Sequence, residues 1–212
     1  MEMFTNKEGA AIVPGLVRAI QENKDYLSEI DGAIGDGDHG INMNKGFTLC
    51  GERLTGGEDL SGALETLGEI LLCEIGGSMG PIYGTFFGEM GQAVRNWEEI
   101  GEAEFGRMLE AGLAGIRELV PTDVGDKTLL DALIPAVNAY REAEEAGKGF
   151  AEALDAAAEA AEAGRDATKD MVAKVGRASR LGERSRGVLD AGASSCAVIV
   201  RSMCETAKGL LG

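Results

Sequence analysis

A short segment near the N-terminus, Asp31-Gly-Ala-Ile-Gly-Asp-Gly-Asp-His-Gly40, combines three carboxylates with glycine. Asp31, Asp36 and Asp38 lie within one short stretch, and acidic side chains this close repel one another unless a cation lies between them. Oxygen ligands of this kind suit Mg²⁺ or Ca²⁺, and glycine lets the backbone turn several carboxylates toward one point. The spacing therefore predicts a divalent-cation site on these three aspartates.

Other kinds of site can be compared with the same segment. Residues 35–40 match the dinucleotide fingerprint G-x-G-x-x-G, but that fingerprint follows a strand, and residues 24–30 are predicted to be helical. Its variable positions are aspartates here, which would repel a bare pyrophosphate. An EF-hand loop starting at Asp36 would need a carboxylate at Phe47 and glycine at Ile41, so it is excluded. A plain surface turn of Asp and Gly remains open.

His39, beside these carboxylates, is the only histidine in the chain. A lone histidine is commonly a hydrogen-bonding residue, and next to a phosphate this one could donate to an oxygen. Its position alone does not make it a covalent nucleophile.

Three further segments could bind an anion. Residues 76–85 place small residues before Pro81, which describes a helix start whose free N–H groups face outward, or else a simple turn. Residues 125–131 open another helix, and residues 176–192 form a glycine-containing segment that could fold over a ligand. The chain has no G-x-x-x-x-G-K-[ST] sequence, so it is not a P-loop protein.

The charge distribution singles out the last of these segments. The net charge of −16 makes nucleic acid a poor partner, because binding it requires Lys and Arg to neutralise phosphates. Within residues 165–186, however, basic residues outnumber acidic ones, which indicates a candidate anion site, although a solvated charged loop is the alternative. The basic residues are Arg165, Lys169, Lys174, Arg177, Arg180, Arg184 and Arg186.

The elements that must position these segments are predicted to be helices. Apolar residues recur at i, i+3, i+4 and i+7, as in Ile12, Val13, Leu16, Val17 and Ile20. We expect about eight helices in a single domain over residues 1–212. Breaks between them are expected near residues 31–40, 54–60, 75–81, 97–102, 121–126, 147–149 and 176–191. Scattered cysteines, the lack of a secretory signal and the lack of a long apolar run favour a cytoplasmic protein.

The four segments, in this order, resemble the nucleotide-binding L subunit (DhaL, or DAK2 domain) of dihydroxyacetone kinases. The family patterns are D-x-x-I-G-D-x-D-H-G-x-N-M, G-G-x-S-G-P-L-Y-G-T, G-D-K-T-M-x-D-A-L, and G-R-A-S-x-L-G-E-R-S with a downstream D-P-G-A. The match spans nearly the whole chain. The resemblance implies an all-α fold, an eight-helix antiparallel up-and-down barrel with the nucleotide at one rim.

The resemblance also implies roles for individual residues. Asp31, Asp36 and Asp38 would hold two Mg²⁺ ions that bridge the phosphates of ADP or ATP, and Arg177 would be the catalytic cation. Three positions depart from the family patterns: Met79 replaces a serine, Leu129 a methionine and Ala191 a proline. The implied nucleotide contacts are His39, Gly40, Ile41, Asn42, Ser78, Met79, Leu129, Arg177, Asp190, Ala191 and Gly192.

The function implied is that of a kinase subunit that works only with partners. Dihydroxyacetone would bind a separate K subunit, and an M subunit of the phosphotransferase system, carrying a phosphohistidine, would recharge the retained ADP. Two alternatives stay open: an ATP-dependent kinase subunit for another ketose such as erythrulose, and an ADP-sensing module that binds a transcriptional regulator. A homodimer is also possible, whereas nucleic acid and membrane are not expected partners.

Overall fold

Amphipathic helices make up most of the structure, a computed structural model that describes residues 2–212. The all-α prediction is confirmed. The α-helices are α1 (Asn6–Gly9), α2 (Ile12–Glu22), α3 (Lys24–Ile34), α4 (His39–Arg53), α5 (Leu60–Glu74), α6 (Met79–Val94), α7 (Glu102–Leu119), α8 (Leu130–Glu145), α9 (Phe150–Ala167) and α10 (Ala191–Leu210). Two 3₁₀ segments, η1 (Thr168–Asp170) and η2 (Ala178–Ser185), and two strands, β1 (Met3–Thr5) and β2 (Glu99–Gly101), complete the order.

The helices form because their apolar residues share one buried face. In α2 all five residues of the predicted stripe are buried, and full burial of each such side chain contributes about 1.5–3 kcal/mol. The window at residues 196–200, expected to be a buried helix, lies inside α10 and is buried except at Val198. The core therefore runs the length of the bundle.

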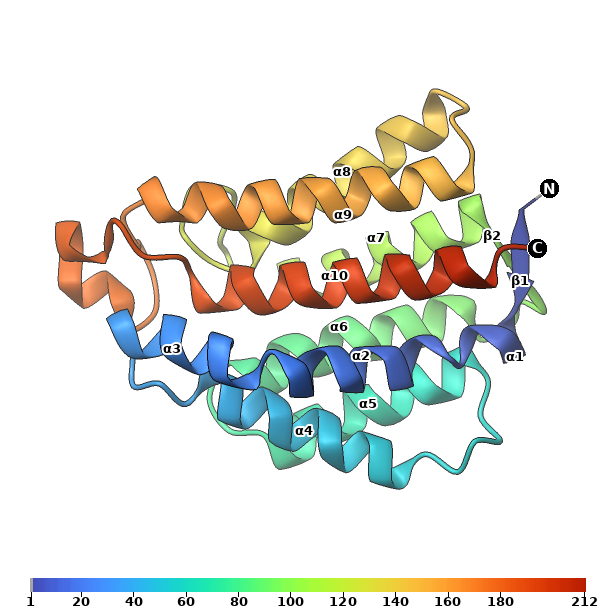
Figure 1. The fold of residues 1–212 in the computed structure, drawn as a ribbon, viewed down its shortest axis with the longest axis horizontal. Coiled ribbons are helices and arrows are strands. Elements are labelled where there is room, and N and C mark those ends of the chain that lie inside the picture. The colour runs from blue at the N-terminus through green and yellow to red at the C-terminus, as the bar shows by residue number, and fades with distance from the viewer. Residues whose placement is uncertain (1) are drawn as a thin grey trace.

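Helices that are consecutive in the chain lie beside one another (Figure 1). From α4 to α10 each long helix packs against the next, and α10 also packs against α2, which in turn packs against α4. Helix α3 continues beyond α2 and lies against α4 and α10. Because the long helices alternate in direction, every second connection emerges at the same end.

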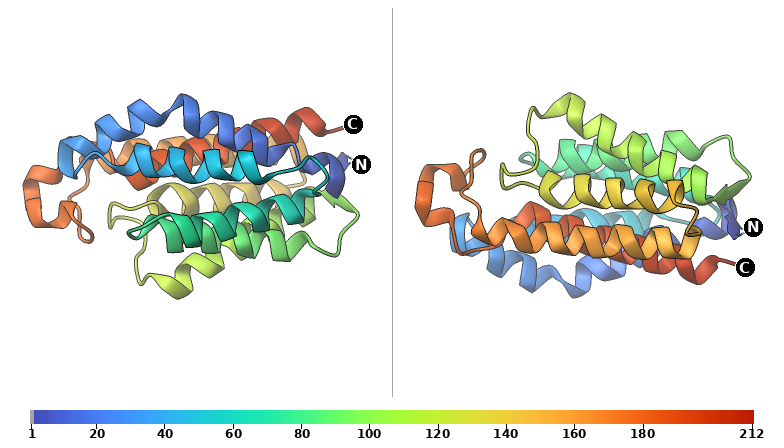
Figure 2. Two further views of the ribbon diagram at one scale, coloured as in Figure 1. Left: turned by 90° about the horizontal axis from the view of Figure 1, so that it is seen from below. Right: turned by 90° about the horizontal axis from the view of Figure 1, so that it is seen from above.

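The connections at one end are the four segments singled out in the sequence. The α3–α4, α5–α6 and α7–α8 loops and the α9–α10 connection all lie toward the left in Figure 1. Both views in Figure 2 place the α9–α10 connection, drawn in orange, beyond the end of the bundle and beside the light-blue α3. We call this end the loop end.

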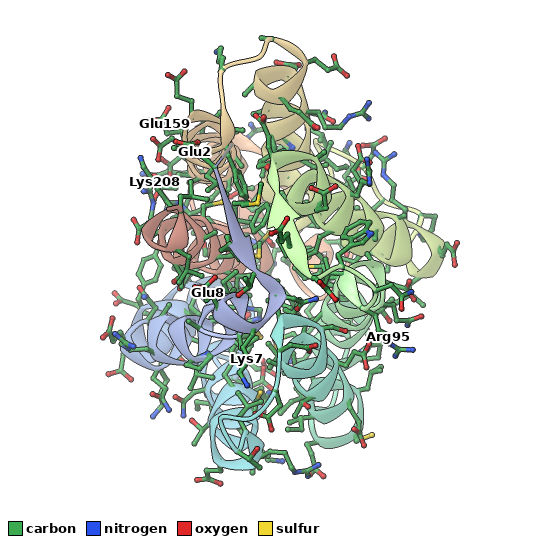
Figure 3. The ribbon with its side chains drawn as sticks, turned by 90° about the vertical axis from the view of Figure 1, so that its right-hand side faces the viewer. Glu2, Lys7, Glu8, Arg95, Glu159 and Lys208 are labelled. Carbon is green, nitrogen blue, oxygen red and sulfur yellow. The ribbon has the colours of Figure 1, made fainter. Side chains whose placement is uncertain are left out.

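The opposite end carries the C-terminus of α10 (Figure 1) and a small feature that the sequence did not predict, a two-stranded ribbon (Figure 3). Strands β1 and β2 pair antiparallel, with Phe4 opposite Ile100. Both side chains are buried, so the ribbon covers this end of the core. No helix in the described part of the chain is long and apolar enough to cross a bilayer.

The helix boundaries differ from expectation near the N-terminus. The first expected helix is divided into α1, α2 and α3, so the described residues contain ten α-helices rather than about eight. Helix α3 also continues to Ile34, because the backbone N–H of Gly35 closes its last turn on the carbonyl of Asp31 at 2.5 Å. The expected loop at residues 31–40 is therefore only residues 35–38, and Asp31 is a helical residue.

Candidate functional site

The three predicted metal ligands come together between two helices. Asp31 lies in the last turn of α3, Asp36 in the loop, and Asp38 at the N-cap position of α4. Each offers a carboxylate oxygen, and these oxygens all lie within 4.8 Å of one another. Gly37, with φ of 77°, adopts the left-handed conformation that brings the chain back toward α3. The donor set fits a hard divalent cation, which prefers oxygen ligands.

Arg177 reaches the same cluster from the α9–α10 connection. Its guanidinium forms an ion pair with the carboxylate of Asp36. Both side chains are largely exposed, 63% for Arg177 and 49% for Asp36, so the pair contributes little to stability. A weak, exposed pair can exchange for another anion, which makes Arg177 available to a ligand bound at the aspartates.

His39 contacts a buried pair of hydroxyl groups, from Ser195 and Tyr83, that the sequence did not predict. Its Nε2 lies 2.8 Å from Ser195 Oγ on α10, and the hydroxyl of Tyr83 on α6 lies 2.7 Å from the same oxygen. Burial lowers the pKa of His39 to about 4, with the Asp31 carboxylate opposing this effect, so the ring is neutral near pH 7. The contact joins three helices over long sequence distances, which no local pattern reveals.

Gly40 fixes how closely α4 approaches α3. A Cβ at this position would collide with the carbonyl oxygen of Lys24 and would lie 2.8 Å from the backbone nitrogen of Ser28. Backbone atoms cannot yield as a side chain can, so only glycine allows this approach. The spacing of the two helices, and with it the aspartate loop between them, depends on this residue.

The Gly40→Ala variant is expected to lower the free energy of unfolding by about 1–3 kcal/mol, because the extra methyl forces the two helices apart. Urea unfolding followed by circular dichroism measures this change. Gly88→Ala in α6 is the control, since a Cβ there meets no atom within 4 Å and alanine favours the helix. Equal stability of the two variants would contradict the proposed packing.

Several predicted contact residues meet at the start of α10. Gly192 packs against Leu129, since a Cβ on Gly192 would lie 3.3 Å from the Leu129 nitrogen, and its carbonyl oxygen lies 3.1 Å from Ser195 Oγ. Asp190 caps the helix, where its carboxylate accepts from the backbone N–H of Ala193 at 2.7 Å. Ala191 is buried behind this cap.

Desolvation raises the pKa of Asp190 to about 6 from 3.8, although the hydrogen bond from Ala193 lowers it. Because the folded-state pKa is the higher one, the stabilising effect of protonation is fully present below about 3.8 and is lost as the pH rises through about 6. Relative to Asp190→Asn, the wild-type chain should therefore gain about 1 kcal/mol between pH 7 and pH 5. Urea unfolding of both proteins without nucleotide or metal measures this gain, and a pH-independent difference would contradict it.

The remaining predicted nucleotide contacts also lie at the loop end, but they do not contact one another as the residues at the start of α10 do. Ile41 is exposed and Asn42 partly buried on the first turn of α4. Ser78 is exposed at the N-cap position of α6, whereas Met79 is half-buried and packs on the core. No described contact joins Ser78 or Met79 to the aspartate cluster, so the structure brings them to the same end rather than into one contact set.

Comparison with known proteins identifies the arrangement. Residues 33–205 match the model of the family described as the DAK2 domain. The chain belongs to the DAK2 family. The match covers every predicted site residue of the chain except Asp31, which lies just before it.

The DAK2 relatives cover nearly all of this chain. It is 41% identical over 189 residues to "PEP-dependent dihydroxyacetone kinase 1, ADP-binding subunit DhaL" of Listeria innocua. The aligned region covers 88% of this chain and 89% of the relative. The corresponding Escherichia coli subunit is 37% identical, covering 87% of this chain and 89% of its own length.

The DAK2 fold is also seen in a solved structure. The crystal structure of the dihydroxyacetone kinase of C. freundii superposes with a TM-score of 0.69 at 26% identity, covering 93% of this chain. This chain spans only 34% of that kinase's length. The same kinase has been solved in complex with AMP-PNP and Mg²⁺, and there the TM-score is 0.68.

Proposed function

We propose that this chain is the nucleotide-carrying subunit of a dihydroxyacetone kinase and is active only with partner subunits in the cytoplasm. The relatives named as ADP-binding subunits of such kinases match this chain over almost their whole length. The observation that carries the proposal is the cluster of Asp31, Asp36 and Asp38 facing Arg177. Three carboxylates beside one arginine suit a polyphosphate bound through divalent cations.

The proposed roles follow the family. Asp31, Asp36 and Asp38 would hold two Mg²⁺ ions, which would supply positive charge to the phosphates of the nucleotide. The proposed nucleotide contacts are His39, Gly40, Ile41, Asn42, Ser78, Met79, Leu129, Arg177, Asp190, Ala191 and Gly192. We further propose that residues 1–212 form one DAK2 domain, with the long helices closed into an eight-helix barrel. The packing of α10 against α2 supports this closure.

Phosphoryl transfer needs placement and charge stabilisation more than covalent help from the protein. The neutral ring of His39 can hydrogen-bond a phosphate oxygen through Nδ1–H when Ser195 donates to Nε2. Arg177 exchanges its pair with Asp36 for the transferring group and stabilises the charge that develops on it. The aspartates and Arg177 are therefore the groups that we expect to lower the activation energy of phosphoryl transfer.

Partner binding is proposed at the loop end, because the phosphoryl group must pass to a sugar held by another subunit. Of the six large apolar side chains exposed in the described residues, two are in the connections at the loop end and three are in the helix turns next to those connections. Large apolar side chains exposed at one end of a molecule are typical of a surface that binds another protein. These residues are Ile41, Leu72, Leu119, Val124 and Val175. We propose that the K and M subunits dock there in turn.

A kinase for another ketose is the weaker alternative. L-Erythrulose kinase of Pectobacterium atrosepticum is 34% identical, but this chain covers only 31% of its length. The ADP-binding subunits are matched almost completely. An ADP-sensing role beside a regulator has no specific observation in its favour.

The proposal is tested by reconstituting the chain with its cognate K and M subunits and measuring ketose phosphate. Turnover is expected with dihydroxyacetone when phosphorylated M is the donor, and little is expected with ATP in place of M. Erythrulose in place of dihydroxyacetone separates the two ketose assignments. Sustained turnover from ATP without M would overturn the proposed phosphoryl source, and a preference for erythrulose would overturn the sugar assignment.

A further inference from the structure

The segment that carries Arg177 has its own anchor. Residues 171–188, here called the arginine segment, leave η1, pass through η2 and return to the start of α10. Near its tip Arg177 pairs with Asp36, whereas its two ends lie together at its base. There the N–H of Ala173 donates to Ser185 Oγ at 2.9 Å, and that of Gly187 donates to the Lys169 carbonyl at 2.7 Å.

The buried ammonium of Lys127 binds both ends of this base. Its Nζ donates to the carbonyl oxygens of Met171 at 3.2 Å, Ser185 at 2.5 Å and Val188 at 2.6 Å. These three bonds use all the donors that a lysine has. Met171 precedes Arg177 in the chain, and Ser185 and Val188 follow it, so one side chain joins the two ends of the arginine segment.

The local structure shows that Lys127 is forced into this position. It is the only non-glycine residue with positive φ (62°) among the described residues, and only 2% of it is exposed. A lysine with positive φ and a buried charge is unfavourable unless its surroundings hold it there. Asp131 does so, because its carboxylate accepts the backbone N–H groups of Gly125 at 2.6 Å and Thr128 at 2.7 Å. Burial also lowers the pKa of the Lys127 ammonium.

We propose that Lys127 is a positioning residue, which fixes the base of the arginine segment on the start of α8 and thereby sets where Arg177 stands over the aspartate cluster. The catalytic consequence rests on the proposed function. We call the three hydrogen bonds of the Lys127 ammonium the clasp. The exposed ion pair between Arg177 and Asp36 can open, but the clasp keeps the Arg177 guanidinium within reach of the aspartate cluster. The three partners of the Lys127 ammonium are backbone carbonyls of the arginine segment, and none is an aspartate of the cluster, so Lys127 acts through Arg177.

The clasp is tested first by limited digestion with trypsin. The arginine segment contains Lys174, Arg177, Arg180, Arg184 and Arg186, so its opening creates cleavage sites that mass spectrometry can map. Lys127→Met is expected to raise cleavage within the segment at least roughly tenfold, because local opening limits proteolysis. Lys208→Met, which removes an exposed lysine paired with Asp155 at the far end (Figure 3), is the control. Cleavage of Lys127→Met at the wild-type rate would overturn the clasp.

Action through Arg177 is tested by a double-mutant cycle in the reconstituted transfer assay. In the wild-type background Lys127→Met should lower kcat about tenfold to a hundredfold, with the dissociation constant of ADP changed less than about threefold. Added to Arg177→Ala, it should lower kcat less than about threefold further, because the residue through which it acts is already gone. Lys127→Arg, which keeps the charge, should restore part of the loss. Equal losses in both backgrounds would overturn the proposal.

The two proposals fail in different ways. If the wild-type chain neither binds ADP nor transfers phosphate, the proposed function fails, while trypsin still decides whether Lys127 holds the segment. If Lys127→Met does not fold, hydrogen exchange of the wild-type chain replaces it. The amides of Ala173 and Gly187 should then exchange at least roughly tenfold more slowly than those of the tip, residues 175–180. Uniformly fast exchange would overturn the clasp.

Discussion

The Asp36→Ala variant is expected to lose bound ADP during purification, whereas the wild-type chain retains it. Asp36 is one of three carboxylates whose oxygens lie within 4.8 Å of one another, and on the proposed function the two that remain would hold Mg²⁺ poorly. Even residues that only support a metal ligand contribute tenfold to a hundredfold to metal affinity, so loss of a direct ligand should weaken Mg·ADP binding by more than about a hundredfold. Isothermal titration calorimetry with Mg·ADP measures the loss.

The same variant should remain folded. Asp36 is half exposed and its ion pair with Arg177 is accessible to water, so its removal should change the free energy of unfolding by less than about 1 kcal/mol. Asp25→Ala, which removes an exposed carboxylate from the first turn of α3, the helix before the aspartate loop, is the matched control and should keep its ADP. Tight ADP in the Asp36→Ala protein would show that the aspartates do not hold the nucleotide.

The Arg177→Ala variant is expected to keep ADP but to lose roughly a hundredfold to a thousandfold in kcat. The guanidinium is expected to stabilise charge on the group in transit, which matters in the transition state more than in the bound nucleotide. Transfer from phosphorylated M to dihydroxyacetone on the K subunit measures kcat, and calorimetry measures ADP binding.

The control for this variant is Arg95→Ala. Arg95 is also exposed and also forms an ion pair, with Glu65 at 2.7 Å, but it lies at the end of the bundle opposite the site (Figure 3). It should leave both kcat and ADP binding unchanged. A tenfold weaker ADP affinity in Arg177→Ala, with kcat unaltered at saturation, would show that Arg177 acts in nucleotide binding alone and would contradict its catalytic role.

Local patterns in the sequence predicted the helices and the convergence of three aspartates. A helical stripe can be recognised from residues a few turns apart, as in Ile12 to Ile20. Such a pattern predicts a helix because the apolar residues that recur at this spacing share the buried face. The aspartate loop was also local, since Asp31, Asp36 and Asp38 are neighbours in the chain. The contact of this loop with Arg177 was not local, because Arg177 lies more than a hundred residues away in the chain. The alternating direction of the helices brings the two segments to the same end.

Long-range contacts account for what the sequence did not predict. Strands β1 and β2 are three residues each and pair across almost the whole N-terminal half, too short to show an alternating pattern. The hydroxyls of Tyr83 and Ser195 acquire their role only where α6 and α10 meet beside His39. Lys127 was visible as part of a motif, but its left-handed backbone and buried ammonium follow from the path of the arginine segment.

Metal and nucleotide analysis of freshly purified protein tests the central claim most directly. The protein is denatured, the released nucleotide is identified by mass spectrometry, and Mg²⁺ is counted against it. The proposed function predicts ADP with two Mg²⁺ per nucleotide, and both should be absent from the Asp36→Ala protein. ADP bound without Mg²⁺, or Mg²⁺ content unchanged by the substitution, would contradict the account.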